Sequence, residues 1–130
     1  KFHETDIKQP SPWSVRFAIE TLDDVHIGNC MYYDISLQKQ TTELGIMIGD
    51  KKYWGQGYGT EALNLTLEHI YSFTEINLVY LHTLESNLRA QASFKKSGLT
   101  EKKAVARNRY NFIRMEITKS EWLNLVQPIK

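Results

Sequence analysis

The chain has 130 residues, of which 42% are hydrophobic and 24% charged, and its formal net charge is +1. This length suits a single domain with a core of normal size, and the near-zero charge argues against nucleic acid or membrane as a bulk electrostatic partner. The single cysteine, Cys30, excludes an internal disulfide and suits a reducing, cytoplasmic location. No apolar run approaches the roughly 20 residues of a membrane span.

The first half of the chain predicts an antiparallel meander. Residues 1–14 are polar and contain Pro10 and Pro12, which predicts a loop or an extended arm. Three β-rich stretches with short links follow, at 15–21, 25–37 and 41–49. Gly28 inside the second stretch indicates a bulge or a close backbone approach.

The second half predicts a βαβ crossover, a second helix and a hairpin. The expected elements are a helix at 60–73, a strand at 76–84, a helix at 87–97, strands at 102–106 and 111–118, and a short helix at 120–123. Thr60 is the expected N-cap of the first helix and Asn87 of the second, with Gly98 at the C′ position of the second. The strands at 41–49 and 76–84 should run parallel, because a helix joins them.

A glycine-rich loop separates the strand at 41–49 from the helix at 60–73. Gly55, Gly57 and Gly59 alternate with Gln56 and Tyr58. Glycine permits positive φ and close approach of backbone N–H groups to a ligand, and a helix start adds unpaired amides and a positive dipole end. This predicts an anion site, most naturally for a diphosphate. The spacing matches neither the dinucleotide fingerprint nor the phosphate-binding loop of nucleotide triphosphatases, so a glycine-rich turn without a ligand is the alternative.

Three segments together resemble the GNAT superfamily of acetyl-CoA-dependent N-acetyltransferases. They are E-L-G-I-M-I-G at 43–49, Y-W-G-Q-G-Y-G-T-E-A at 53–62, and the stretch 87–99, which looks like the family's N-x-x-A…Y-x-K-x-G-F. The nearest likeness is to the branch that contains the ribosomal-protein N-terminal acetyltransferases and the spermidine acetyltransferases. The resemblance extends over about residues 17–122.

The resemblance implies an α/β fold with a mixed sheet, in which an antiparallel meander precedes a βαβ crossover with splayed parallel strands. It implies acetyl-CoA as the cosubstrate, with the glycine loop on the diphosphate and the pantetheine arm in the gap between the splayed strands. The residues that would bind it are Ile46, Met47, Ile48, Trp54, Gly55, Gln56, Gly57, Tyr58, Gly59, Thr60, Asn87, Ser93, Phe94 and Lys96. An N–H near Met47 would polarise the thioester carbonyl, and Asn87 would reach the pantetheine.

The chain departs from the family pattern in three places. Trp54 stands where the family loop usually begins with Gln or Arg, and Phe94 stands where a tyrosine usually donates a proton to the leaving thiolate. A thiol pKa of about 8.5 makes the free thiolate a tolerable leaving group, and Ser93 or water could assist. The family also has a strand and two helices before the strand at 15–21. We therefore expect residues 1–130 to form one domain that lacks these elements, as a fragment or as a self-associating chain such as a homodimer.

Acetyl transfer needs a neutral amine, and a primary amine with a pKa near 10.4 is neutral only about once in ~10³ at pH 7. Glu43 is the candidate base, acting directly or through a water, because it shares its strand face with Gly45 and Met47. The alternative is a solvated glutamate or a structural ion pair. His26, His69 and His82 are scattered, and histidines in such positions are more often packed or surface residues than bases.

The remaining candidates carry weaker signals. No His, Cys or carboxylate cluster has metal spacing, and Cys30 is interpreted as a core residue. Tyr32, Tyr33 and Tyr80 are interpreted as core residues, although one of them could line the acceptor channel. Lys95, Lys96, Lys102 and Lys103 form a solvated face or meet the 3′-phosphate of CoA.

The predicted function is transfer of acetyl from acetyl-CoA to a primary amine, on a protein N-terminus or a small molecule, by direct attack. One alternative is a CoA-binding module without acyl transfer, and another is a regulatory domain that binds ATP more tightly than CoA.

Overall fold

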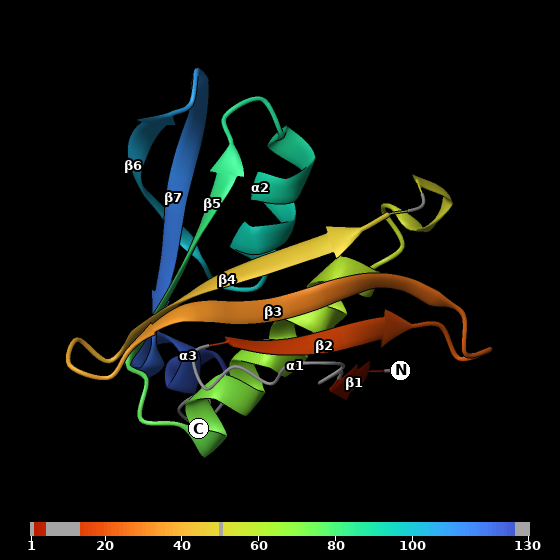
Figure 1. Cartoon of the computed structure of the whole chain (residues 1–130), viewed down its shortest axis with the longest axis horizontal. Coiled ribbons are helices and arrows are strands. Elements are labelled where there is room, and N and C mark those ends of the chain that lie inside the picture. Colours follow the sequence, from red (N-terminus) through yellow and green to blue (C-terminus); the bar gives the residue numbers. More distant parts are fainter. Residues whose placement is uncertain (1, 5–13, 50, 127–130) are drawn as a thin grey trace.

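The computed structural model describes residues 2–4, 14–49 and 51–126. The elements in chain order are β1 (Phe2–Glu4), β2 (Ser14–Glu20), β3 (His26–Ser36), β4 (Thr41–Ile48), the 3₁₀ turn η1 (Lys51–Tyr53), α1 (Tyr58–Phe73), β5 (Leu78–Leu84), α2 (Leu88–Lys96), β6 (Thr100–Arg107), β7 (Tyr110–Thr118) and α3 (Lys119–Val126). The strands of these ranges form one seven-stranded sheet in the order β1-β2-β3-β4-β5-β7-β6 (Figure 1).

The sheet is mixed, as predicted. Strands β1 to β4 form an antiparallel meander, β4 and β5 run parallel, and β5, β7 and β6 are again antiparallel. The parallel pairing of β4 with β5 runs only from Thr41 opposite Leu78 to Glu43 opposite Tyr80. Beyond that pair the two strands diverge, and α2 lies beside the opening (Figure 1). The predicted splay is therefore confirmed.

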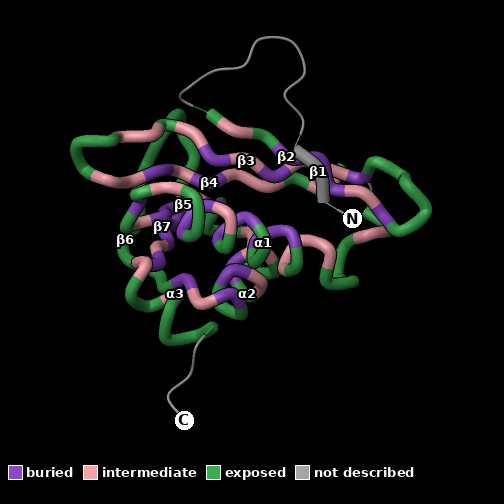
Figure 2. Tube along the Cα trace, turned by 90° about the horizontal axis from the view of Figure 1, so that it is seen from below, coloured by how far each residue is buried: buried purple, intermediate pink, exposed green. Residues whose placement is uncertain are grey.

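The core lies between the sheet and α1. Alternation along β4 turns Thr42 and Leu44 inward, and helical spacing turns Leu63, Leu67 and Ile70 of α1 towards them, with exposures of 2% or less. Burying each of these aliphatic side chains stabilises the fold by roughly 1.5–3 kcal/mol. In the part of the chain that the structure describes, the helices all lie on one side of the sheet (Figure 2). The opposite face, which carries Glu43, has no helix of the described ranges over it.

The entry into α1 differs from the prediction. The helix begins at Tyr58, and its N-cap is Gly57 rather than Thr60. Gly57 has φ 87°, and its carbonyl accepts from the Glu61 N–H at 2.9 Å. Glycine adopts this left-handed conformation without strain. The helix therefore begins earlier than it would with Thr60 as its N-cap. Thr60 instead pairs its hydroxyl with that of Ser93 at 2.8 Å.

The second helix follows the prediction at both ends. Asn87 caps α2, and its side-chain oxygen accepts from the Ala90 N–H at 3.1 Å. Gly98 follows the helix with φ 99°. A Cβ at this position would lie 2.3 Å from a terminal methyl carbon of Leu125, so a side chain here would require this leucine of α3 to move.

Gly28 is a close-approach position, as predicted. A Cβ there would lie 2.0 Å from the Met47 carbonyl oxygen, and the β2–β3 register shifts beside it at Ile19 and Glu20. Strands β3 and β4 therefore approach more closely than any side chain at this position would permit.

Several element boundaries also differ from the predictions. The extended arm contains β1 at Phe2–Glu4, while Pro10 and Pro12 lie outside the described residues. β5 begins at Leu78, and the final hairpin is longer than predicted because Asn108 and Arg109 adopt the two left-handed positions of a tight turn, with φ 49° and 70°. None of the described helices is long and apolar enough to span a membrane.

The last helix is longer than the predicted 120–123. Thr118 and Glu121 form a reciprocal cap, in which the Thr118 N–H donates to the Glu121 carboxylate at 2.9 Å and the Glu121 N–H donates to the Thr118 hydroxyl at 3.1 Å. This T-x-x-E signature places the helix start at Lys119 and was overlooked in the sequence.

Candidate active site

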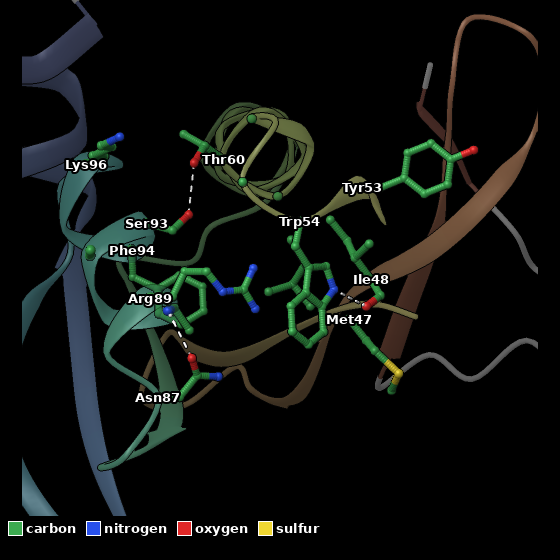
Figure 3. Close-up of a pocket in the computed structure, with 16 residues that line it drawn as sticks. Met47, Ile48, Tyr53, Trp54, Thr60, Asn87, Arg89, Ser93, Phe94 and Lys96 are labelled. Atoms are coloured by element: carbon green, nitrogen blue, oxygen red, sulfur yellow. Dashed lines mark hydrogen bonds between the residues drawn. The ribbon is translucent and has the colours of Figure 1, made fainter. Parts of the chain in front are cut away.

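A cavity of about 440 Å³ lies where β4 separates from β5, between β4, the glycine loop and α2 (Figure 3). Of the residues expected to bind the cosubstrate, those that line it are Ile46, Met47, Ile48, Trp54, Gly55, Gly57, Gly59, Thr60, Asn87, Ser93, Phe94 and Lys96. Gln56 and Tyr58 do not line the cavity. The Gln56 side chain donates to the Lys52 carbonyl, and the Tyr58 ring packs edge-on against Tyr53.

The glycine loop has the geometry of an anion site. Gly55 and Gly57 have φ 75° and 87°, and a Cβ built on either would meet no atom within 4 Å. The loop leads directly into the N-terminus of α1, a helix of 16 residues with no side-chain hydrogen bond at its N-cap. Its first amides and its dipole therefore favour an anion beside the loop.

Trp54 and Arg89 connect the two walls of the cavity. The Trp54 indole N–H donates to the Ile48 carbonyl at 2.9 Å, and the Arg89 guanidinium carbon lies 3.9 Å from the centre of the indole ring (Figure 3). A carbonyl has two lone pairs, so the Ile48 oxygen still has capacity for a ligand. Sequence reasoning missed Arg89, because its position inside the N-x-x-A segment indicates no partner.

Among the described residues, the charged side chains that line the cavity are all cationic. Arg89 and Lys96 supply two cations, and none of the described residues that line the cavity is acidic. The other lining residues that the sequence did not indicate are Tyr53, Ala90 and Ala92. Phe94, which is 8% exposed, contributes a ring that has no proton to donate. The cavity is therefore suited to an anionic ligand with an apolar segment.

Glu43 and His82 lie together on the open face of the sheet. His82 Nδ1 and Glu43 Oε2 are 2.8 Å apart, with side chains 10% and 12% exposed. Glu43 belongs to the last β4–β5 pair, and His82 follows two residues beyond its partner Tyr80. No sequence pattern indicates this pairing, because 39 residues separate the two side chains.

Two tyrosines flank this pair. Tyr33 lies over Gly45, where a Cβ would be 3.3 Å from its ring, and burial followed by the nearby Glu43 carboxylate raises the pKa of Tyr33 to about 12. Tyr80 donates to Asp34 Oδ2 at 3.2 Å, and burial followed by the Asp34 charge raises the pKa of Tyr80 to about 12. Both hydroxyls are therefore neutral at physiological pH.

Charged side chains complete this face. The Arg114 guanidinium carbon lies 3.8 Å from the centre of the Tyr80 ring, and Arg114 pairs with Glu116 at 2.8 Å. The arrangement can bind a cationic group at its carboxylates and accept a proton at the Glu43–His82 pair.

The other candidates lie away from the cavity. Cys30 is fully buried against the Thr66 hydroxyl, and burial raises the pKa of its thiol to about 11, which is unsuited to carrying an acyl group. His26 bonds to the Gly28 carbonyl, and His69 to the Tyr32 hydroxyl. Lys95, Lys102 and Lys103 are exposed. Among the described residues no group of three His, Cys, Asp or Glu side chains could hold a metal ion.

Comparison with known proteins identifies a family model and similar folds. The family model for the acetyltransferase (GNAT) domain matches residues 2–100. A complex of Vibrio cholerae spermidine N-acetyltransferase with CoA and spermine is similar to the chain, with 22% identity and a TM-score of 0.78 over 87% of this chain and 70% of that one. A dodecameric structure of the same enzyme, in an intermediate state, has 21% identity and a TM-score of 0.79 over 89% and 71%. At such identities the likeness shows the fold. No curated protein sequence is significantly similar.

Proposed function

The chain belongs to the GNAT acetyltransferase family, and from this premise we propose that it transfers an acetyl group from acetyl-CoA to a primary amine by direct attack. The observation that carries the proposal is the cavity at the β4–β5 splay, which is lined by the glycine-rich anion site. The Glu43–His82 pair lies on the same two strands, at the end of their pairing. A cosubstrate in the gap would present its thioester towards this pair.

We propose acetyl-CoA as the ligand of this cavity. Past Glu43 the edge of β4 has no pairing with β5, so the backbone groups of Ile46 and Ile48, which alternate away from β3, can bond to the pantetheine amides, whereas Met47 pairs with Asn29 of β3. The glycine loop and the α1 N-terminus would hold the diphosphate, and Asn87 and Lys96 would contact the pantetheine and a phosphate. The support for this proposal is the shape of the cavity and the positive charge of Arg89 and Lys96 in its lining.

The proposed reaction forms an N–C bond and breaks the C–S bond without a covalent enzyme intermediate. The amine must first be neutral, which costs about 4–5 kcal/mol at pH 7 without a base. We propose that this step depends on the Glu43 carboxylate. The CoA thiolate leaves without an acid at Phe94, and the Ser93 hydroxyl or water would stabilise it.

For the acceptor we propose a primary amine of a small molecule or a protein N-terminus. The similar V. cholerae enzyme binds spermine in its complex with CoA, and the resemblance to the branch that contains ribosomal-protein N-terminal acetyltransferases suggests a peptide instead. The carboxylates of Glu43 and Asp34 on the open face support a cationic acceptor of either kind. Self-association is also proposed, because one similar structure is dodecameric.

The test measures CoA release from acetyl-CoA with a thiol reagent, over a panel of spermidine, lysine amide and short peptides with free N-termini. Calorimetry measures CoA and ATP affinity in parallel, and light scattering measures the oligomeric state. Turnover with at least one amine supports the proposal. CoA binding without turnover indicates a binding module, and tighter binding of ATP than of CoA indicates a nucleotide-binding domain.

A further inference from the structure

We propose that His82 Nε2 takes the proton from the acceptor amine and that Glu43 acts through it by orienting the imidazole. This inference rests on the proposed acetyl transfer and assigns the atom that receives the proton. It changes the role expected for Glu43, from a base in its own right to the carboxylate partner of a base.

The hydrogen bond defines the tautomer. An ionised carboxylate only accepts hydrogen bonds, so at 2.8 Å from Glu43 Oε2 the Nδ1 atom of His82 carries a proton. In the neutral imidazole the lone pair then lies on Nε2. This is the arrangement by which a carboxylate prepares a histidine base in hydrolytic triads.

The Nε2 atom is available to a substrate. Within the described ranges, the only hydrogen bond of His82 is the one through Nδ1. Among the described side chains, the fully enclosed polar atom without a partner is Ser97 Oγ, so Nε2 of His82 is not fully enclosed although the side chain is only 10% exposed. We infer that this nitrogen is the position at which the amine approaches.

The position of His82 suits this role. It follows the last β4–β5 pair by two residues, so it lies on the strand that borders the gap in which the pantetheine is proposed to run. The Tyr80 ring packs edge-on against the imidazole, with ring centres 5.9 Å apart, and holds its orientation.

The groups around the pair support this assignment of roles. From β3, Tyr33 and Asp34 face this region, and from β7, Arg114 faces His82 in the strand register while pairing with Glu116. Asp34 accepts from Tyr80, and Glu116 is paired with Arg114. The carboxylate that reaches the imidazole is therefore that of Glu43.

Two protons leave the amine nitrogen in this reaction. The protonated amine first gives one proton to Nε2, and the imidazolium, stabilised by Glu43, releases it to water. The neutral nitrogen then attacks the thioester carbonyl, its second proton passes to Nε2, the C–S bond breaks, and CoA leaves as the thiolate, which takes this second proton from the imidazolium. Histidine is the side chain that most often accepts the proton in general base catalysis.

The deciding variant is His82→Asn, measured with the amine of the panel that turns over fastest. The asparagine amide sits near the Nδ1 position and can still donate to Glu43, but it has no counterpart of Nε2. We expect kcat to fall by ~10²–10³ at neutral pH, with CoA affinity unchanged. His26→Asn, a change at an exposed histidine outside the cavity and the pair, should leave kcat within about twofold.

Two results would overturn the assignment. One is a His82→Asn enzyme that retains kcat within threefold while Glu43→Gln is inactive, because Glu43 would then take the proton itself. The other is independent of any variant: nitrogen-15 NMR of the wild-type protein should show neutral His82 protonated at Nδ1, and protonation at Nε2 refutes the proposal. A wild-type protein that binds CoA but acetylates no amine overturns the proposed function, and this assignment with it.

Discussion

The two sides of the gap between β4 and β5 are built from different chemistry. The cavity beside α2 is lined by loop glycines, strand backbone and two cations, Arg89 and Lys96, with no acidic residue among its described lining. The open face of the sheet instead carries side-chain pairs, Glu43 with His82 and Tyr80 with Asp34. The cavity is thus suited to an anionic cosubstrate, and the open face to a cationic acceptor.

The two sides also differ in whether main-chain or side-chain atoms form the proposed contacts. On the cavity side, the main chain and its φ angles provide most of the proposed contacts, so only backbone-altering changes should have large effects on CoA binding. On the open face, individual side chains provide them, so changes there should alter turnover and leave CoA affinity intact. A single variant that alters both by similar factors would break this separation.

The largest effect is expected on the open face, from Glu43→Gln. We expect kcat to fall by ~10²–10³ at neutral pH, no further than for His82→Asn, because the His82 imidazole loses the carboxylate that orients it. The loss should shrink as pH rises, since more of the amine is then neutral in solution. The measurement is the pH–rate profile from pH 6 to 10, with CoA affinity as the control. A profile identical to that of the wild type would indicate that Glu43 forms a purely structural ion pair and takes no part in catalysis.

The next effect is expected on the cavity side, from Gly57→Val. Gly57 has φ 87°, which costs an L-residue roughly 1–2 kcal/mol, and a branched side chain would fill the space proposed for the diphosphate. CoA affinity should weaken at least tenfold, or about 1.4 kcal/mol, in calorimetry.

Gly49→Ala is the matched control for this variant. Gly49 does not have a positive φ, and a Cβ there meets no atom within 4 Å. Its CoA affinity should remain within twofold of the wild type. A folded Gly57→Val protein with unchanged affinity would remove the loop from the site.

The same difference between main chain and side chains explains what could be predicted from the sequence. The glycine loop, β4 and the start of α2 are contiguous segments whose residue types imply their conformation, so the anion loop and the α2 cap follow from local patterns. The splay and most of the cavity lining were instead predicted from the resemblance to the acetyltransferase family. The prediction of Thr60 as the N-cap was wrong, because α1 already begins at Tyr58 and its N-cap is Gly57, which has a left-handed φ. The T-x-x-E cap of α3 was present in the sequence and was overlooked.

The open face, by contrast, depends on register. Glu43 lies beside His82 only because β4 pairs with β5 from Thr41 to Glu43 and then diverges. Composition and periodicity do not define that register across 39 residues. Arg89 was missed for a similar reason, since its partner Trp54 belongs to a different segment.

A smaller effect is expected from Arg89→Ala. Arg89 supplies one of two cavity cations and packs on the Trp54 ring at 3.9 Å. Cation–π contacts at partly exposed sites contribute about 0.5–1 kcal/mol, a factor of about two to five, and the variant also loses a positive charge beside the proposed anionic ligand. We therefore expect CoA affinity to weaken about three- to tenfold, with kcat nearly unchanged. Arg89→Lys keeps the charge and loses the planar stacking, so its affinity should be intermediate. Equal CoA affinities of both variants and the wild type would show that Arg89 packs against Trp54 without contributing to CoA binding.

The smallest effect is expected from Tyr33→Phe, which removes the Tyr33 hydroxyl from the open face. The variant tests whether turnover needs this hydroxyl as a hydrogen-bond donor or as a group that ionises. Burial, with the Glu43 charge, raises the pKa of Tyr33 to about 12, so its hydroxyl is protonated throughout pH 6–10. Its removal takes one hydrogen bond from the Glu43 carboxylate and leaves the Glu43–His82 bond in place. We therefore expect kcat to fall only about two- to fivefold, without a shift of either limb of the pH–rate profile.

The same pKa makes a separate claim about stability. An unfolded tyrosine ionises near pH 10 and the folded Tyr33 near pH 12, so its contribution is fully present below pH 10 and declines as pH rises towards 12, where the unfolded state has lost its proton first. Urea unfolding at pH 9 and pH 11 should therefore show a smaller alkaline decline for Tyr33→Phe than for the wild type. An equal decline would mean that Tyr33 ionises alike in the folded and unfolded states, and a new limb in the rate profile below pH 10 would mean that Tyr33 ionises in the working range.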